Sequence, residues 1–295
     1  AAGNNSFPLK WFDDLRNFYS LVVSTVELSS TTNRRAAEIS WDTARAARAS
    51  GLADTAAKHY QIAVSIATMS CISDESLQAA YLMRAELVAL LDEGKTGLSN
   101  LEIATVKNDL GVDFRRQGIL DMALDLCQSA LKMRIAELGK EHLLVANALN
   151  NVANILQSLE RYEEALPQYE EALRVTVRLV GREHKNVATE LNNMALVHKK
   201  LGMFDKAVQQ YRESLELRVK VLGKEHPEVA ATLYNLASLF AQRGDRSKAG
   251  PMFDRAALIY SKALGPTHSE AQDARRKAQL CMGEGLPAEG SVSAF

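Results

Sequence analysis

The sequence predicts an all-α fold, a right-handed superhelix (α-solenoid) of antiparallel helix pairs, and two regularities predict it. An aliphatic residue and a glycine, followed three positions later by a histidine, recur with the glycine at every 42nd residue, at positions 139, 181, 223 and 265. Small residues recur at the same interval, as in Ala165 and Ala172 followed by Ala207 and Ser214. A fixed period of roughly 20–50 residues is typical of stacked repeats and not of a single-core globule.

The sequence pattern of each 42-residue unit predicts two helices. The first carries apolar residues at spacings of three and four, such as Val145, Leu149 and Val152, which indicates one buried stripe. The small residues of the second helix let neighbouring helix axes approach closely. We expect the helix pairs near residues 101–137, 143–179, 185–221 and 227–263.

Glycines are expected at both ends of the second helix. Gly118, Gly202 and Gly244 supply the tight turn before it, and Glu160 stands at this position in the remaining unit. The glycine of the recurring phrase, for example Gly181, is expected to end the helix as a left-handed C′ residue.

The chain divides into five predicted segments. Residues 1–32 form an N-terminal amphipathic helix or cap, 33–100 degenerate repeat-like helices with one helix over 75–92, 101–268 four regular units, 269–282 a C-terminal capping helix, and 283–295 an extended tail. The first helix, over residues 8–26, either buries the open end of the solenoid or docks another subunit. Its apolar face consists of Trp11, Leu15, Phe18, Val22 and Val26.

Composition limits the partners and the compartment. The 35 basic and 36 acidic residues give a net charge of −1, so nothing favours nucleic acid as a partner. Three widely spaced cysteines imply no disulfide framework and favour a reducing intracellular compartment. No apolar run approaches the roughly 20 residues of a membrane-spanning helix. Because the sequence begins with Ala1, we expect either a cytoplasmic protein or one inside a chloroplast or mitochondrion after removal of a targeting peptide.

The motifs that could carry chemistry all favour structural interpretations. The histidines of the recurring phrase cannot share a metal, because adjacent helices lie roughly 8–10 Å apart while zinc ligands lie within about 2.3 Å of the ion. The segment 89–96 imitates a phosphate-binding loop, but it ends a helix and places Asp92 and Glu93 where an anion would bind. The sequence therefore predicts no enzyme, no cofactor and no metal site.

The units resemble tetratricopeptide repeats, in particular the 42-residue variety of kinesin light chains. The residues that carry the resemblance are Leu-Asn-Asn-Val-Ala at 149–153 and Leu-Asn-Asn-Met-Ala at 191–195, the alanine and tyrosine positions of the second helices, and the phrase Leu-Gly-Lys-Glu-His-Pro at 222–227. The match is fullest from Glu141 to Leu264.

The resemblance implies that the first helix of each unit lines a concave groove that binds a protein partner. Carried over residue by residue, the groove contains Asn108, Asn150, Asn154, Asn192, Tyr234 and Ser238, with Asn151, Asn193 and Asn235 beside them and Arg115, Arg116, Lys199 and Lys200 nearer the edge. An asparagine amide can both donate to and accept from a peptide backbone. Alternatively, these amides hydrogen-bond the adjacent repeat.

Two functions remain open at this point. The first is a non-enzymatic scaffold or adaptor that binds a partner peptide or subunit in the groove, with the basic residues favouring acidic side chains. The second is a structural subunit or assembly factor of a large, possibly organellar, complex, held by its convex face and its termini. The sequence predicts no oligomeric state.

Overall fold

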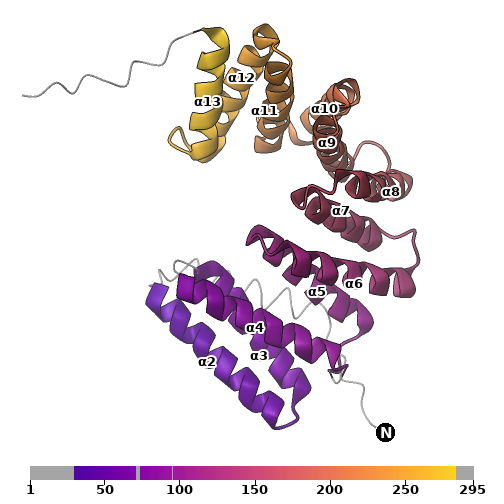
Figure 1. Ribbon diagram of the computed structural model, residues 1–295, viewed down its shortest axis with the longest axis vertical. Coiled ribbons are helices and arrows are strands. Elements are labelled where there is room, and N and C mark those ends of the chain that lie inside the picture. Colours follow the sequence, from indigo (N-terminus) through magenta and orange to yellow (C-terminus); the bar gives the residue numbers. More distant parts are fainter. Residues whose placement is uncertain (1–29, 71–73, 95, 284–295) are drawn as a thin grey trace, which may run out of the picture. The chain divides into compact units, whose positions relative to one another are not determined.

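The computed structural model describes residues 30–70, 74–94 and 96–283, and within these ranges all regular secondary structure is helical (Figure 1). The predicted helix with Trp11, Leu15, Phe18, Val22 and Val26, and the tail from residue 284, lie outside the described residues. The chain forms two compact units. The first comprises residues 1–113 and 132–137, and the second 114–131 and 138–295.

The first unit contains α2 (Ser30–Ala49), α3 (Ala53–Ser70), α4 (Asp74–Asp92) and most of α5 (Asn100–Arg116). Helices α2, α3 and α4 lie side by side in chain order (Figure 1). Three small residues of this group, Ala44, Ala56 and Ala63, are fully buried. Because α4 ends at Asp92, residues 89–94 of the run that imitates a phosphate-binding loop are a helix end followed by a turn.

The second unit continues the regular array. It contains α7 (Leu143–Ser158), α8 (Tyr162–Val180), α9 (Lys185–Lys200), α10 (Phe204–Leu222), α11 (Pro227–Gln242), α12 (Arg246–Leu264) and α13 (Ser269–Met282), after α6 (Leu120–Leu138), whose residues divide between the units. Helices of 16 and 19 residues alternate from α7 to α12. The predicted helix pairs near 143–179, 185–221 and 227–263 are therefore confirmed in type and position.

The core of the second unit is built from the recurring small and aromatic positions. Ala207, Tyr211 and Ala249 are fully buried in one cluster with Phe253 and Leu239, which lie on α10, α11 and α12. An alanine at a helix crossing leaves room for the aromatic ring of the next turn, so the two residue types together fill the contact.

Each first helix from α7 to α13 begins with a histidine cap. The Nδ1 atoms of His142, His184, His226 and His268 accept the backbone N–H two residues further on, at 3.1, 3.2, 3.2 and 3.4 Å. A helix start leaves such N–H groups without a partner, and Ser, Thr, Asp or Asn commonly satisfies them. Here the imidazole does so, which explains why a histidine recurs directly before each of these first helices.

The glycines that end the second helices differ from the prediction of a left-handed C′ residue, which is wrong. Gly181, Gly223 and Gly265 are themselves the C-cap residues, with φ of 83°, 87° and 101° but ψ of 170°, 154° and 150°. Positive φ with extended ψ is a region open essentially to glycine alone. The chain adopts it because it passes directly from the helix into the extended approach to the histidine cap.

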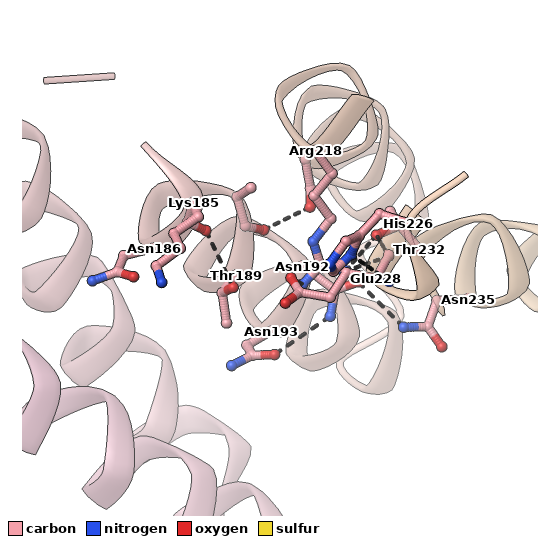
Figure 2. Close-up of polar contacts among 12 residues, drawn as sticks. Lys185, Asn186, Thr189, Asn192, Asn193, Arg218, His226, Glu228, Thr232 and Asn235 are labelled. Atoms are coloured by element: carbon pink, nitrogen blue, oxygen red, sulfur yellow. Dashed lines mark hydrogen bonds and ion pairs between the residues drawn. The ribbon is translucent and has the colours of Figure 1, made fainter. Parts of the chain in front are cut away.

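A polar pair connects each of two second helices to the first helix that follows it. Thr176 Oγ1 on α8 donates to Glu190 Oε1 on α9 at 2.8 Å. One period later, Arg218 Nη1 on α10 donates to Thr232 Oγ1 on α11 at 2.6 Å (Figure 2). All four side chains are buried. The same place in successive units thus holds different polar partners.

Helix α13 carries polar residues at two positions where an earlier first helix carries buried alanines. Where α11 carries the fully buried Ala230 and Ala237, the 42-residue register places Gln272 and Gln279 on α13. Gln272 is exposed and Gln279 half-buried. Terminal repeats need a polar outer face for solubility, so a capping role for α13 stays a prediction.

Glu160 provides a local test of the turn geometry. It is the non-glycine residue with positive φ, 60°, in the described part of the chain, at the position where the next unit has Gly202 with φ of 74°. A side chain in this region costs about 1–2 kcal/mol, partly offset by the greater freedom of glycine in the unfolded chain. We expect Glu160→Gly to raise the free energy of unfolding by about 0.5–1 kcal/mol in urea titrations.

The matched control for this substitution is Gly202→Ala. A Cβ at Gly202 meets no atom within 4 Å, so the change tests backbone strain alone and should lower stability. An unchanged or lower free energy of unfolding for Glu160→Gly, or an unchanged or higher one for Gly202→Ala, would contradict the assignment of strain to Glu160.

Candidate functional site

The predicted groove residues of the second unit lie mainly on one side of the first helices. The 42-residue register gives α7, α9 and α11 equivalent rows that begin with Asn150 and Asn151, Asn192 and Asn193, and Tyr234 and Asn235. We call the side of α7, α9, α11 and α13 that carries these rows the inner face. Its asparagines are half-buried, so each amide touches both protein and solvent.

Side-chain amides connect the first helices directly. Asn193 Nδ2 on α9 donates to Asn154 Oδ1 on α7 at 3.2 Å and, more weakly, to Asn150 Oδ1 at 3.5 Å. Asn235 Nδ2 on α11 donates to Asn192 Oδ1 at 3.2 Å, and Asn192 Nδ2 donates to Asn193 Oδ1 at 3.4 Å (Figure 2). We call these five residues the asparagine ladder. Part of the hydrogen-bonding capacity of these amides therefore connects neighbouring repeats. This is the alternative that the sequence left open.

The ladder also has hydrogen-bonding capacity that the described protein does not use. The amino groups of Asn150 and Asn154 donate to no described residue, and the carbonyl of Asn235 accepts from none. The hydroxyl of Ser238, one turn further along α11, likewise has no partner among the described residues. None of these atoms is buried without a partner, so they contact solvent.

Tyr169 fixes the orientation of Asn154. Its hydroxyl donates to Asn154 Oδ1 at 2.6 Å, and burial raises the pKa of this hydroxyl, which stays a neutral donor. Because the carbonyl of Asn154 receives bonds from both Tyr169 and Asn193, its amino group is directed away from them.

Tyr234, which we predicted as a groove residue, is held by α13. Its hydroxyl donates to Asp273 Oδ2 at 2.5 Å and accepts a hydrogen bond from Lys277, whose Nζ lies 4.5 Å from the Tyr234 ring centroid. Arg276 and Lys277 also contact Asp273, at 2.8 and 3.0 Å. Burial opposes ionisation of Asp273, but the hydrogen bonds from Tyr234, Arg276 and Lys277 lower its pKa to about 2.

Asp273, Arg276 and Lys277 were not among the predicted site residues. Arg276 and Lys277 stand one period after Tyr234 and Asn235, so they continue the rows of the inner face onto α13. The sequence could have predicted these two residues, because the recurring Gly-x-x-His pattern at 265–268 shows that the 42-residue repeat continues into this helix. Treating 269–282 as a cap alone concealed it.

The predicted basic residues occupy the ends of α9 and α5. Lys199 is half-buried and Lys200 exposed. Burial, and then the charges of Lys200 and Lys277, lower the pKa of Lys199. Arg115 is half-buried and Arg116 exposed, both at the end of α5.

Two further predicted residues contribute differently. Asn151, beside Asn150 on α7, is half-buried and takes part in other contacts. Asn108 belongs to the first unit, is 7% exposed and donates to Asp109 Oδ1 at 3.2 Å. Its amide therefore has little contact with solvent.

Two hollows lie away from the inner face. The larger, of about 480 Å³, is bordered by α8, α9 and α10 and lined by Leu173, Val177 and Leu191, with arginines at its rim. Arg174 there is paired with Glu141 and Glu171 at 2.6 and 2.8 Å. The smaller, of about 380 Å³, lies along α10. Neither contains any of the predicted groove residues.

Glu190 has the shifted pKa often found in catalytic groups, but its position indicates a structural role. Burial raises its pKa to about 7, and the hydrogen bond from Thr176 only partly opposes this. The side chain is 3% exposed, so it has almost no surface for a substrate.

The described residues of the inner face present amides, hydroxyls and cations, and these groups suit binding.

The fold and the inner face define an α-solenoid of stacked helix pairs, and comparison with known proteins gives its family. The tetratricopeptide repeat model matches residues 102–176 and 186–256. The chain is a tetratricopeptide-repeat protein, which confirms the family seen in the sequence, and its fold is similar to that of kinesin-light-chain repeats. Proteins of this fold are built for interaction with other proteins.

Solved structures support the fold. The crystal structure of BtubC (BKLC) from P. vanneervenii is 19% identical and has a TM-score of 0.59, covering 89% of this chain and 97% of that one. The putative kinesin light chain with nearly identical TPR-like repeats from Podosopora anserina is 18% identical, with a TM-score of 0.53 over 63% of this chain and 89% of that one. Comparison with curated proteins found no match. Among the described helices, none has the length and apolar character needed to cross a membrane.

Proposed function

We propose that this protein is a non-enzymatic scaffold or adaptor whose inner face binds an extended segment of a partner protein. The observation that carries the proposal is the unused hydrogen-bonding capacity of the asparagine ladder: amino groups on Asn150 and Asn154, and a carbonyl on Asn235. A peptide backbone presents both carbonyls and N–H groups, so it can bond to both kinds of atom.

The spacing of the repeats suits such a ligand. Packed helices lie roughly 8–10 Å apart, and an extended chain rises about 3.3 Å per residue. A segment that crosses from α7 toward α11 would therefore meet one amide about every third residue. Because the ladder bonds hold Asn154 and Asn235 in place before binding, little side-chain freedom is lost when the segment binds.

Replacing both Asn150 and Asn154 with aspartate should weaken partner binding about tenfold or more. The change keeps the side-chain shape and the oxygen atoms that accept from Asn193 and Tyr169, but it removes the unused donors. The partner would first be identified by affinity purification of the native protein and mass spectrometry. Its affinity for both forms would then be measured by calorimetry.

Asn186→Asp is the control, because Asn186 is also half-buried but lies at the start of α9, away from the ladder. It should leave the affinity unchanged. Equal affinity for wild type and the Asn150/Asn154 double variant would refute binding at the ladder.

Exposed apolar residues on the second helices favour the alternative, a structural subunit or assembly factor of a larger complex. Leu179 on α8 and Val219 and Val221 on α10 are 44%, 40% and 41% exposed. If partners survive the ladder variant but are lost with Val221→Lys, or with deletion of residues 1–28 or 283–295, this second function replaces the first.

A further inference from the structure

We propose that helix α8 and the larger hollow beside it form a contact surface for a second copy of this chain, in which the two α8 helices lie antiparallel about a two-fold axis. We call this the α8 surface. It consists of Glu163, Glu170, Arg174, Arg178 and Arg182 together with the hollow residues Leu173, Val177, Val187 and Leu191. All of them belong to the second unit and lie away from the inner face, so the inference goes beyond the proposed function and does not depend on it.

The charges of α8 are separated along its length. Its four acidic residues, at positions 163, 164, 170 and 171, all precede its two arginines, Arg174 and Arg178, and Arg182 stands two residues after the helix end. When two such helices meet antiparallel, the acidic half of each faces the basic half of the other. The same residues then meet twice, as the isologous interface of a two-fold dimer requires.

The helix dipole alone does not account for this order. It favours acidic residues in the first turn and basic residues in the last turn of every helix. In the second helices α6, α10 and α12, however, a basic residue precedes an acidic one. These pairs are Arg134 and Glu137 on α6, Lys206 and Glu213 on α10, and Arg246 and Asp254 on α12. Among these four second helices, complete separation is therefore particular to α8.

The exposed charges of α8 retain capacity for an external partner. Glu163 and Glu170 are exposed and form no ion pair with the described residues. The side chains of Arg178 and Arg182 are 66% and 79% exposed, and their ion pairs within the chain, at 3.4 and 3.9 Å, include no hydrogen bond to a described residue. Because a guanidinium group carries five N–H donors, both arginines can bond carboxylates of a second copy.

The hollow places apolar surface directly beside these charges. It has a volume of about 480 Å³, and Arg178 and Arg182 line it together with Leu173 and Val177. The two aliphatic side chains are half-buried, so each still contacts solvent. Removal of this apolar surface from water favours association, while the charges around it set the orientation of the partner. One continuous surface thus contains both contributions.

Reversal of either charged half should weaken self-association. In sedimentation velocity at low salt, we expect the wild type to form a species of twice 32.4 kDa, and added salt should dissociate it. Arg178→Glu combined with Arg182→Glu should raise the dimer Kd about tenfold or more, because both halves of α8 become acidic. Glu163→Lys combined with Glu170→Lys should do the same by making both halves basic. Melting temperatures should change little, because the four side chains are exposed.

Mixing the two variants tests the antiparallel arrangement. Each variant alone brings like charges together, whereas in a mixed dimer every acidic half faces a basic half. The mixture should therefore recover the dimer, and so should a chain that carries all four substitutions. Absence of recovery in both experiments would overturn the arrangement.

Arg246→Glu combined with Lys262→Glu is the matched control. Both residues are exposed on the second helix α12, and the pair makes the same change in net charge. This variant should retain the dimer, and a loss equal to that of the Arg178/Arg182 variant would indicate a general charge effect and overturn the proposal. Val177→Thr, which adds a hydroxyl to the hollow, should weaken the dimer without unfolding the chain.

The remaining outcomes separate this proposal from the proposed function. The Asn150/Asn154 variant should dimerise as the wild type does, because its residues lie on the inner face. A wild-type chain that stays monomeric at low salt would overturn the proposal and leave binding at the ladder untouched. If the native partner then loses affinity for the Arg178/Arg182 variant, the α8 surface serves another protein and not a second copy.

Discussion

Replacing Glu190 with glutamine is expected to raise the free energy of unfolding by about 2 kcal/mol at pH 8 and to change it little at pH 4. Burial raises the pKa of Glu190 from 4.5 to about 7, and Thr176 bonds one carboxylate oxygen. The other oxygen is buried and has no hydrogen-bond partner among the described residues. At pH 8 the folded protein must hold a poorly compensated buried charge, which glutamine does not carry.

The sign of the pH effect follows from the two pKa values. The folded protein binds this proton more tightly than the unfolded chain, so its stabilising contribution is complete below about pH 4.5 and is lost as the pH rises through 7. Urea unfolding between pH 4 and pH 8 should therefore show a fall in stability that is smaller in the Glu190→Gln variant. Glu170→Gln, an exposed carboxylate on α8, is the control and should retain the fall. Identical pH profiles for Glu190→Gln and wild type would contradict the prediction.

Replacing Ala207 with leucine is expected to lower stability by about 1–3 kcal/mol, because it overpacks a helix crossing. Ala207 is fully buried against Tyr211, Leu236 and Ala249. For a chain of this size the loss corresponds to a fall in melting temperature of about 2–10 °C. Calorimetry measures it, and Ala165→Leu should behave similarly because Ala165 is also fully buried.

Ala263→Leu provides the control for overpacking. Ala263 is on the exposed side of α12, so the added side chain should be accommodated with little change in melting temperature. Unchanged melting of both Ala207→Leu and Ala165→Leu would mean that the crossings can expand without cost.

The regular array was predictable because several independent constraints coincide in each unit. In one unit, Ala165 marks a close helix crossing, Tyr169 fills the space at that crossing, and Gly181 ends the helix. The separations between these positions repeat in the other units. The conformation of Gly181 was less predictable. Glycine can adopt both the left-handed helical region and the extended region at positive φ, so its presence does not decide between them.

The candidate site was predictable in its positions and less so in its contacts. The register placed Asn150, Asn192 and Asn235 on first helices, but an amide at such a position can bond a neighbouring repeat or a ligand. The structure shows that Asn235 uses its donor toward Asn192 and retains its acceptor. Such a division depends on side-chain rotamers and on distances between repeats, which a sequence period does not specify. Binding of a partner at these residues stays a prediction.

The junction between units has a consequence for how the chain can gain or lose length. After α8, α10 and α12 alike, a glycine with positive φ is followed by two residues and then by a histidine cap. Recombination at these glycines would therefore join equivalent chain ends. Loss of residues 182–223 would remove both Glu190 and Arg218 and place Thr176 opposite Thr232, two neutral partners. Duplication of the same segment would place Arg218 opposite a second Glu190, two opposite charges. Both recombinants would thus retain compatible buried pairs, so we expect this part of the chain to tolerate the gain or loss of a whole repeat.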